Sequence, residues 1–113
     1  MDGKDDDAIG EFSEAIRLDG SPANYFGNRG NAYIAKGDFD KAIADLDQAI
    51  GLAPNEFSYY QTRGFARLKK HETGLARDDF NKALSLNPDA KHKKQIEQAL
   101  KDLGPDYRNM KMQ

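Results

Sequence analysis

The sequence predicts an all-α solenoid built from antiparallel helix pairs, and two observations carry that prediction. The first is a 34-residue internal repeat. Residues 23–56 align without a gap on residues 57–90, and ten positions are identical, where ordinary composition gives roughly two. The second is the spacing of apolar residues, which follows the 3.6-residue period of an α-helix. Units of this kind stack into solenoids because no single unit can bury its apolar face alone.

Each full unit divides into two helices at a glycine and an aspartate. In residues 39–52, small and aliphatic side chains recur at three- and four-residue steps and form one helical face: Ala42, Ile43, Leu46, Ala49 and Ile50. Gly37 can end the first helix, and Asp38 can cap the exposed amides of the second. Pro54 and Pro88 stop the second helices and begin the turn into the next unit.

Small residues that recur in the repeat predict close packing between helices. Gly30 and Gly64 lie inside the first helices and leave the two helices of a unit free to approach closely. Ala49 and Ala83 occupy the place where each second helix meets the next unit. A larger side chain at either kind of position would push the helix axes beyond their usual spacing of about 8–10 Å.

The same register extends into both ends of the chain. Residues 4–19 match only the second half of a unit, through Ala8, Ile9, Phe12, Ala15, Ile16 and Leu18. Residues 91–103 predict a capping helix that turns Ile96, Ala99, Leu100 and Leu103 toward the last repeat. Residues 104–113 lack periodicity and predict a flexible tail. We therefore expect one domain over residues 1–103.

The composition excludes several classes of partner. The 113 residues carry a net charge of −2 with mixed signs, so we expect no nucleic-acid partner, which would need a basic excess. No stretch approaches the roughly 18 apolar residues that span a bilayer, so we expect no membrane association. The acidic start is unlike a secretory signal, and the absence of cysteine fits a reducing compartment. We expect a cytoplasmic protein.

The pattern resembles the tetratricopeptide repeat (TPR) family, in which an aromatic residue, a glycine, a tyrosine, an alanine, a second aromatic residue and a proline recur in 34 residues. The first full unit matches at Phe26, Gly30, Tyr33, Ala42 and Pro54, and the second at Tyr60, Gly64, Ala76, Phe80 and Pro88. The resemblance covers roughly residues 4–103. Leu46 replaces the second aromatic residue, Arg29 and Arg63 replace the family's leucine, and Arg67 replaces its tyrosine.

The resemblance implies a right-handed superhelix whose first helices line a concave face. It also implies that a peptide or helix of a partner protein binds in that concave groove. Thr73 stands where Phe39 stands one repeat earlier, so with Arg67 it predicts a less tightly packed second full repeat.

Polar side chains of the first helices are the candidates for peptide binding. Asparagine and glutamine each carry a donor and an acceptor that can bind the main chain of an extended peptide, while Phe65 offers an apolar contact. A solvated polar face without a ligand is the alternative interpretation. The candidate residues are Asn24, Asn28, Asn31, Ser58, Gln61, Thr62, Phe65 and Lys69.

Some members of the family hold the acidic C-terminus of chaperones through lysine, asparagine and arginine side chains. If residues 23–56 are the middle repeat, the family's asparagine matches Asn28, but its two basic residues fall on Ser58 and Thr62. If the same unit is the first repeat, Asn31 matches and the lysine becomes Gly27. Neither register supplies the cations that pair with a carboxylate, so we expect no chaperone-tail binding.

The N-terminal half repeat lacks its partner helix, so one side of it should be open. Ile9, Phe12 and Ile16 mark this edge. Two explanations stay open: the chain is part of a longer repeat array, or the edge binds another copy and forms a homodimer.

The remaining polar patterns indicate structure and no chemistry. Arg29 with Asp45, and Arg63 with Asp79, recur together and predict an ion pair between the two helices of each repeat. Asp5, Asp6 and Asp7 lack the spacing of a calcium loop and suit a helix N-terminus. His71 and His92 are isolated, without a nucleophile or metal ligand at helical spacing. We expect no cofactor, no metal and no enzymatic activity.

Overall fold

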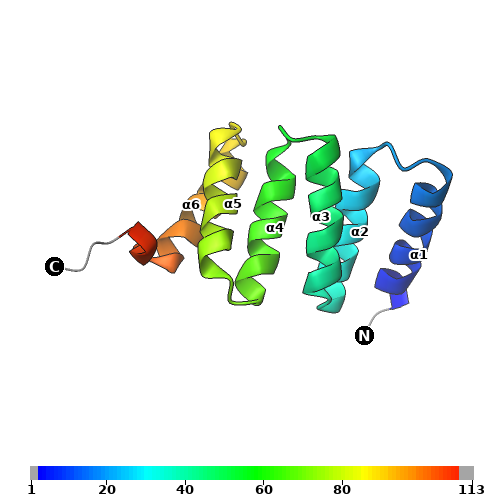
Figure 1. The fold of residues 1–113 in the computed structure, drawn as a ribbon, viewed down its shortest axis with the longest axis horizontal. Coiled ribbons are helices and arrows are strands. Elements are labelled where there is room, and N and C mark those ends of the chain that lie inside the picture. The colour runs from blue at the N-terminus through cyan, green and yellow to red at the C-terminus, as the bar shows by residue number, and fades with distance from the viewer. Residues whose placement is uncertain (1–2, 110–113) are drawn as a thin grey trace.

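The helices of this chain stand side by side in chain order along one long axis (Figure 1). The computed structural model describes residues 3–109. That part holds six α-helices and one short 3₁₀ helix: α1 (Gly3–Leu18), α2 (Ala23–Lys36), α3 (Phe39–Leu52), α4 (Phe57–Lys69), α5 (Thr73–Ser85), α6 (Ala90–Leu103) and η1 (Tyr107–Asn109).

The molecule is elongated, with extents of 55 × 29 × 25 Å. Its radius of gyration of 15.1 Å exceeds the roughly 13 Å expected of a compact domain of this length. The first and last described helices, α1 and η1, lie at opposite ends of the long axis (Figure 1). The predicted all-α helical-repeat solenoid is confirmed.

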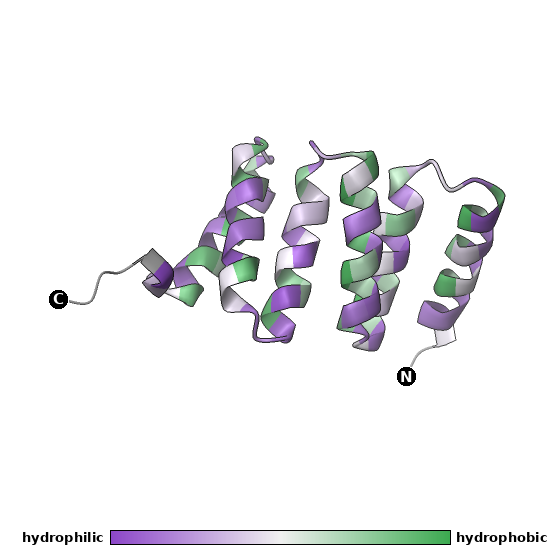
Figure 2. Cartoon of the chain, in the orientation of Figure 1, coloured by the Kyte–Doolittle hydropathy of each residue, from purple (hydrophilic) through white to green (hydrophobic). Residues whose placement is uncertain are grey.

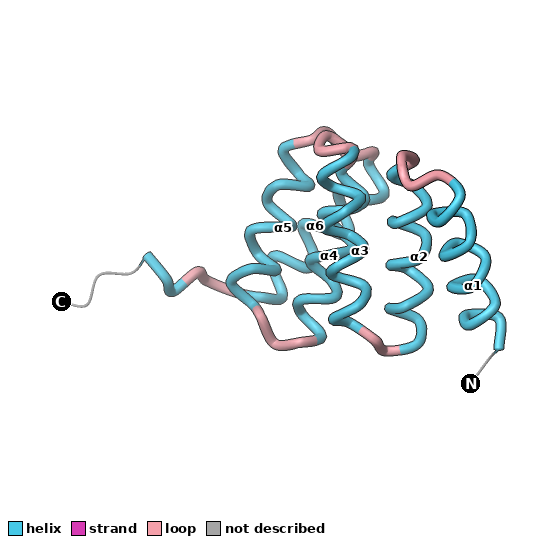
Figure 3. The backbone as a smooth tube through the Cα atoms, turned by 45° about the vertical axis from the view of Figure 1, so that its right-hand side comes forward, coloured by secondary structure: helices cyan, strands magenta, loops and turns pink. Residues whose placement is uncertain are grey.

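Neighbouring helices make two kinds of contact. The two helices of a repeat, α2 with α3 and α4 with α5, make the most extensive contacts. Each second helix also packs on the first helix of the next unit, as α1 does on α2, α3 on α4 and α5 on α6. Figure 3 shows these antiparallel pairs from a second direction. α1 therefore takes the place of a second helix, and no first helix precedes it among residues 3–109.

Hydrophobic and hydrophilic residues alternate along the helices (Figure 2). Ala42, Leu46 and Ala49 of α3 are fully buried. The main core cluster lies in the second full repeat and at α6, around Tyr60, Ala76, Phe80, Ala83 and Ile96. That the second full repeat packs less tightly stays a prediction.

The helix ends follow the local chemistry of the turns. Gly37 ends α2 in left-handed backbone with φ of 80°, and the Asp38 side chain accepts a hydrogen bond from the Lys41 amide at 3.4 Å. His71 fills the corresponding turn after α4 with φ of 63°, a conformation that glycine adopts at lower cost. The Tyr60 hydroxyl donates to the Pro54 carbonyl at 2.9 Å and holds the turn before α4.

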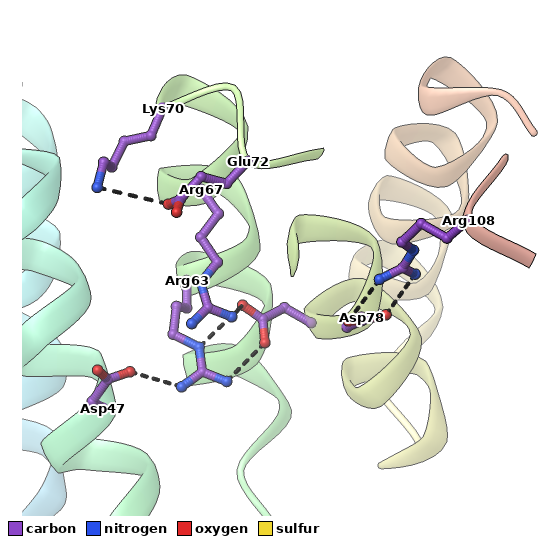
Figure 4. Close-up of polar contacts among 8 residues, drawn as sticks. Asp47, Arg63, Arg67, Lys70, Glu72, Asp78 and Arg108 are labelled. Atoms are coloured by element: carbon purple, nitrogen blue, oxygen red, sulfur yellow. Dashed lines mark hydrogen bonds and ion pairs between the residues drawn. The ribbon is translucent and has the colours of Figure 1, made fainter. Parts of the chain in front are cut away.

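The segment after α6 lies against α5, although the sequence predicts a flexible tail from residue 104. Arg108 donates from Nη2 to Asp78 Oδ1 at 2.8 Å and to Asp106 Oδ2 at 2.9 Å, and Figure 4 shows its reach to Asp78. Arg77 donates to the Pro105 carbonyl at 3.2 Å. The hydrogen bonds from Arg108 lower the pKa of Asp106 to about 2. Residues 110–113 of the predicted tail lie outside the described residues.

Candidate peptide-binding site

A hollow of about 370 Å³ lies between the first helices of the repeats and the capping helix α6. Its lining is mostly amide and hydroxyl side chains with one aromatic ring: Asn31 and Ile34 from α2, Ser58, Gln61, Thr62 and Phe65 from α4, and His92 and Gln95 from α6. No lysine or arginine occurs among the described residues that line it. The hollow therefore offers hydrogen-bonding groups and an apolar surface without a fixed positive charge.

Two hydrogen bonds organise the floor of the hollow. The Gln61 amide nitrogen donates to the Gln95 amide oxygen at 3.3 Å, which joins α4 to α6. The Thr62 hydroxyl donates back to the Ser58 carbonyl at 2.8 Å. The Thr62 proton is thus used within its own helix, while the Gln61 oxygen and the Gln95 nitrogen remain oriented by their shared bond.

Phe65 supplies the apolar contact of the hollow. Its side chain is 43% exposed, whereas two other large aromatic rings of this repeat, Tyr60 and Phe80, are buried. The Lys69 ammonium lies 5.3 Å from the ring centroid, at a distance where a cation is attracted to an aromatic face. Lys69 does not line the hollow but fixes the outer side of this ring.

His92 closes the hollow from α6. Its Nδ1 lies 2.5 Å from Asp89 Oδ1, at the start of the same helix. This hydrogen bond lowers the pKa of the Asp89 carboxyl. The imidazole also packs at a tilt on Phe57, with ring centroids 5.3 Å apart. Two contacts therefore hold the ring, which leaves its remaining nitrogen as the group available to a ligand.

The hollow gathers five of the eight candidate residues from the sequence: Asn31, Ser58, Gln61, Thr62 and Phe65. Asn24 and Asn28 are exposed on α2 but lie outside its lining. The sequence analysis missed Ile34, His92 and Gln95 as lining residues. Continuing the 34-residue register past residue 90 could have found two of them, because Gln95 follows Gln61 and His92 follows Ser58 by that interval.

Comparison with known proteins settles the family. The tetratricopeptide repeat model matches residues 30–101, which is more than half of the chain. The chain belongs to the tetratricopeptide repeat family. No curated protein sequence matches it.

Solved TPR domains share both the fold and part of the sequence. The TPR domain of Arabidopsis OM64 is 31% identical, with a TM-score of 0.81 over 88% of this chain and 82% of that one. The second TPR domain of human RPAP3, solved with the HSP70 peptide SGPTIEEVD, is 30% identical, with a TM-score of 0.82 over 92% and 84%. The first TPR of Spaghetti, bound to the HSP90 peptide SRMEEVD, is 28% identical, with a TM-score of 0.75 over 88% and 82%.

Arg29 and Arg63 link neighbouring helices of this TPR array at equivalent positions. In the first full repeat, Arg29 donates from Nε and Nη2 to Asp45 at 2.8 and 2.7 Å, and from Nη1 to the Ser13 hydroxyl at 3.1 Å. Each such arginine therefore joins its own repeat to the preceding second helix. The predicted ion pair within the repeat is confirmed.

The second full repeat adds a further arginine to the same arrangement. Arg63 donates to Asp79 at 3.0 and 2.8 Å and to Asp47 at 2.7 Å, and Arg67 donates to Asp79 at 2.9 Å (Figure 4). Burial lowers the pKa of Arg63, but its hydrogen bonds to the two carboxylates outweigh that effect and raise the pKa overall. Arg67, which departs from the family pattern, thus gains a partner that a tyrosine would not.

The N-terminal edge of the TPR array is only partly covered. Ile9, Phe12 and Ile16 are each half-buried, and α1 has no fully buried residue. Lys36 of α2 pairs with Asp6 and helps hold α1 in place. Self-association through this edge stays a prediction.

The described residues contain neither a cluster that could hold a metal ion nor a membrane-spanning helix. Within residues 3–109, no three histidine, cysteine or acidic side chains gather as a metal would need. None of the helices in that range has the length and hydropathy to cross a membrane.

Proposed function

We propose that this chain binds an extended segment of a partner protein in the hollow between α2, α4 and α6. The observation that carries the proposal is the lining itself: oriented amides surround an exposed phenylalanine. The main chain of an extended peptide has alternating donors and acceptors, which amide side chains complement. Solved relatives that hold peptides support a protein-interaction role. Catalysis has no part in this proposal, and the cytoplasmic location stays a prediction.

The chemistry of the lining selects among peptide ligands. The two relatives above bind peptides that end in Glu-Glu-Val-Asp, an acidic sequence with a free carboxylate. Here Ser58 and Thr62 occupy the positions of the family's two basic residues for such a ligand. No lysine or arginine is among the described residues that line the hollow. An uncharged stretch that places an apolar side chain on Phe65 is therefore the ligand that we propose.

The extended ligand would continue beyond the hollow along the first helices. Asn24 and Asn28 lie four residues apart on α2, and both side chains are exposed. Lys69 stands past Phe65 at the other end of α4. These three candidates would contact the flanks of the peptide, so their removal should weaken binding less than removal of residues in the hollow.

The test begins with selection of phage-displayed peptides on the immobilised chain. Calorimetry then gives the Kd of the selected peptide for the wild type, for Phe65→Ala and for the double variant Asn31→Ala/Gln61→Ala. Each change should weaken binding about tenfold or more, the loss expected when a buried contact worth over about 1.4 kcal/mol is removed. Asn81→Ala is the matched control, because Asn81 is an exposed amide on α5, outside the hollow.

Two results would count against the proposal. If Asn81→Ala weakens binding as much as Phe65→Ala, the hollow is not the site. If the wild type binds the peptide SRMEEVD as well as it binds the selected peptide, the proposed preference for an uncharged ligand is wrong. The double variant Ser58→Lys/Thr62→Arg should gain affinity for SRMEEVD, because it restores cations beside the hollow.

A further inference from the structure

The open side of α1 has the same residue pattern as the buried sides of α3 and α5. In the 34-residue register, Ala8, Glu11 and Phe12 take the positions of Ala42, Asp45 and Leu46, and of Ala76, Asp79 and Phe80. Each set consists of an alanine, a carboxylate and a large apolar residue. The match includes the charged position, at which Asp45 and Asp79 pair with an arginine in the two inner repeats.

Burial separates α1 from its two equivalents. On α3, Ala42 and Leu46 are fully buried and Asp45 is 5% exposed, and the three residues of α5 are exposed by 3% or less. On α1, Glu11 is exposed, Ala8 and Phe12 are half-buried, and no residue is fully buried. The face is thus built for a contact that the described residues do not make.

The two inner repeats show what covers this kind of face. The covering element is the first helix of the repeat, through an arginine followed by a glycine. Arg29 binds Asp45 with two hydrogen bonds of 2.8 and 2.7 Å. A Cβ atom on Gly30 would lie 3.2 Å from Leu46 Cγ and 3.3 Å from the Ala42 carbonyl, so the helix axes approach as closely as a glycine allows.

The far end of the array lacks these features. In the same register, α6 carries Glu97 where Arg63 stands and Gln98 where Gly64 stands. Docking of α6 from a second copy onto α1 would therefore set Glu97 against Glu11 and a glutamine against Phe12. Like charges in such a contact are unfavourable. Head-to-tail association of two copies does not fit, and both Arg-Gly helices of this chain already cover α3 and α5.

We propose that the face formed by Ala8, Glu11 and Phe12 binds a partner helix that carries an arginine followed by a small residue. The arginine would form a two-bond pair with Glu11, and the small residue would pack over Phe12. Asp7 and Glu14, one turn to either side of Glu11, line one hollow with it. Glu14 is paired with Arg17, so Asp7 is the neighbour that adds negative charge beside Glu11. An arginine-bearing helix is the electrostatic complement of this surface.

A cis graft tests the proposal in the full chain. A copy of residues 21–38, which includes α2 and its Gly37-Asp38 turn, is joined directly before Asp5 in place of residues 1–4. This join reproduces the connection between α2 and α3. The grafted helix should raise Tm by about 5 °C or more, since each kcal/mol shifts Tm by about 4–8 °C in a domain near this size. Glu11→Ala should lower Tm in the grafted chain and leave Tm of the original chain nearly unchanged.

Charge reversal supplies the matched control. Changing the grafted copy of Arg29 to Glu should remove most of the gain in Tm, and adding Glu11→Arg should restore it. The proposal is overturned if the graft leaves Tm unchanged, or if Glu11→Ala has the same effect in both chains. It is equally overturned if analytical ultracentrifugation of the original chain shows a dimer that Phe12→Ala dissociates, because a second copy would then be the occupant. None of these readouts depends on the peptide-binding hollow.

Discussion

Gly64 lies where a single methyl group should reverse the usual effect of replacing a helical glycine. Alanine is favoured over glycine within a helix by about 1 kcal/mol. A Cβ atom at Gly64, however, would lie 2.9 Å from Phe80 Cε1 and 3.1 Å from Cδ1 and Cζ. The Phe80 ring is 3% exposed and belongs to the core cluster, so it cannot turn toward solvent.

The expected magnitude follows from these two opposing effects. Forcing one carbon into a filled core costs about 1–3 kcal/mol, from which the propensity gain of about 1 kcal/mol is subtracted. Gly64→Ala should therefore lower the free energy of unfolding by about 1 kcal/mol. Gly10→Ala is the matched control, because a Cβ atom there meets nothing within 4 Å, and it should raise the free energy of unfolding by about 1 kcal/mol.

Urea denaturation followed by circular dichroism measures both variants, and a shift of the midpoint at constant slope reports stability alone. Leucine stands at position 46, the equivalent of Phe80 in the first full repeat. Phe80→Leu should therefore relieve part of the clash, so the double variant should lose less stability than the two separate losses predict. If Gly64→Ala raises the midpoint as Gly10→Ala does, the inferred close approach of α4 and α5 is refuted.

Three further predictions concern charges and backbone strain. Asp79→Ala should destabilise the chain by about 3 kcal/mol because it leaves two half-buried arginines without their shared carboxylate. Asp45→Ala should cost about 2 kcal/mol because it leaves only Arg29 without its carboxylate. Chemical denaturation measures the free energy of unfolding of both variants. His71→Gly should raise the free energy of unfolding by about 0.5–1 kcal/mol, measured in the same way, because the residue has a positive φ. The pKa of Asp106 is lowered to about 2, so its contribution is present above about pH 4 and is lost as the pH falls toward 2. A ¹³C carboxyl titration by NMR should show that value. Arg108→Ala should raise this pKa only part of the way to its usual value of about 4, because the backbone amide of residue 108 and the Arg77 charge still lower it.

The repeat and the helices could be predicted because they depend on local features of the sequence. A helix period, a glycine at a turn and a proline after a helix each act within a few residues. The pairing of Arg29 with Asp45 was also predictable, since both recur at the same interval as the repeat. The fold class and the ion pair within each full repeat therefore follow from periodicity.

The exact lining of the hollow depended on packing between repeats, which periodicity does not specify. Asn28 and Asn31 are both exposed on α2, but only Asn31 lines the hollow beside α4 and α6. Gln95 joins the site because α6 packs on α5 at a particular angle and depth, set by the fully buried Ile96. A capping role was visible in the apolar residues of α6, while its polar contribution to the site was not.

Contacts of the C-terminal segment were beyond the reach of sequence patterns. Arg108 binds Asp78, 30 residues earlier, and no repeat links the two positions. Arg67 likewise finds Asp79 from a position where the family carries tyrosine. The family pattern at this position gave no sign of the additional ion pair.

Mapping the binding surface by NMR tests directly whether the hollow between α2, α4 and α6 binds the peptide. The ¹⁵N-labelled chain is titrated with the selected peptide, and shifts of backbone and side-chain amides are recorded. If the peptide binds in the hollow, the largest shift changes should occur at Asn31, Gln61, Phe65 and Gln95, with little change on α1 or on the outer face of α5. Changes centred on α1 or α5, with the amides of the hollow unmoved, would contradict binding in the hollow.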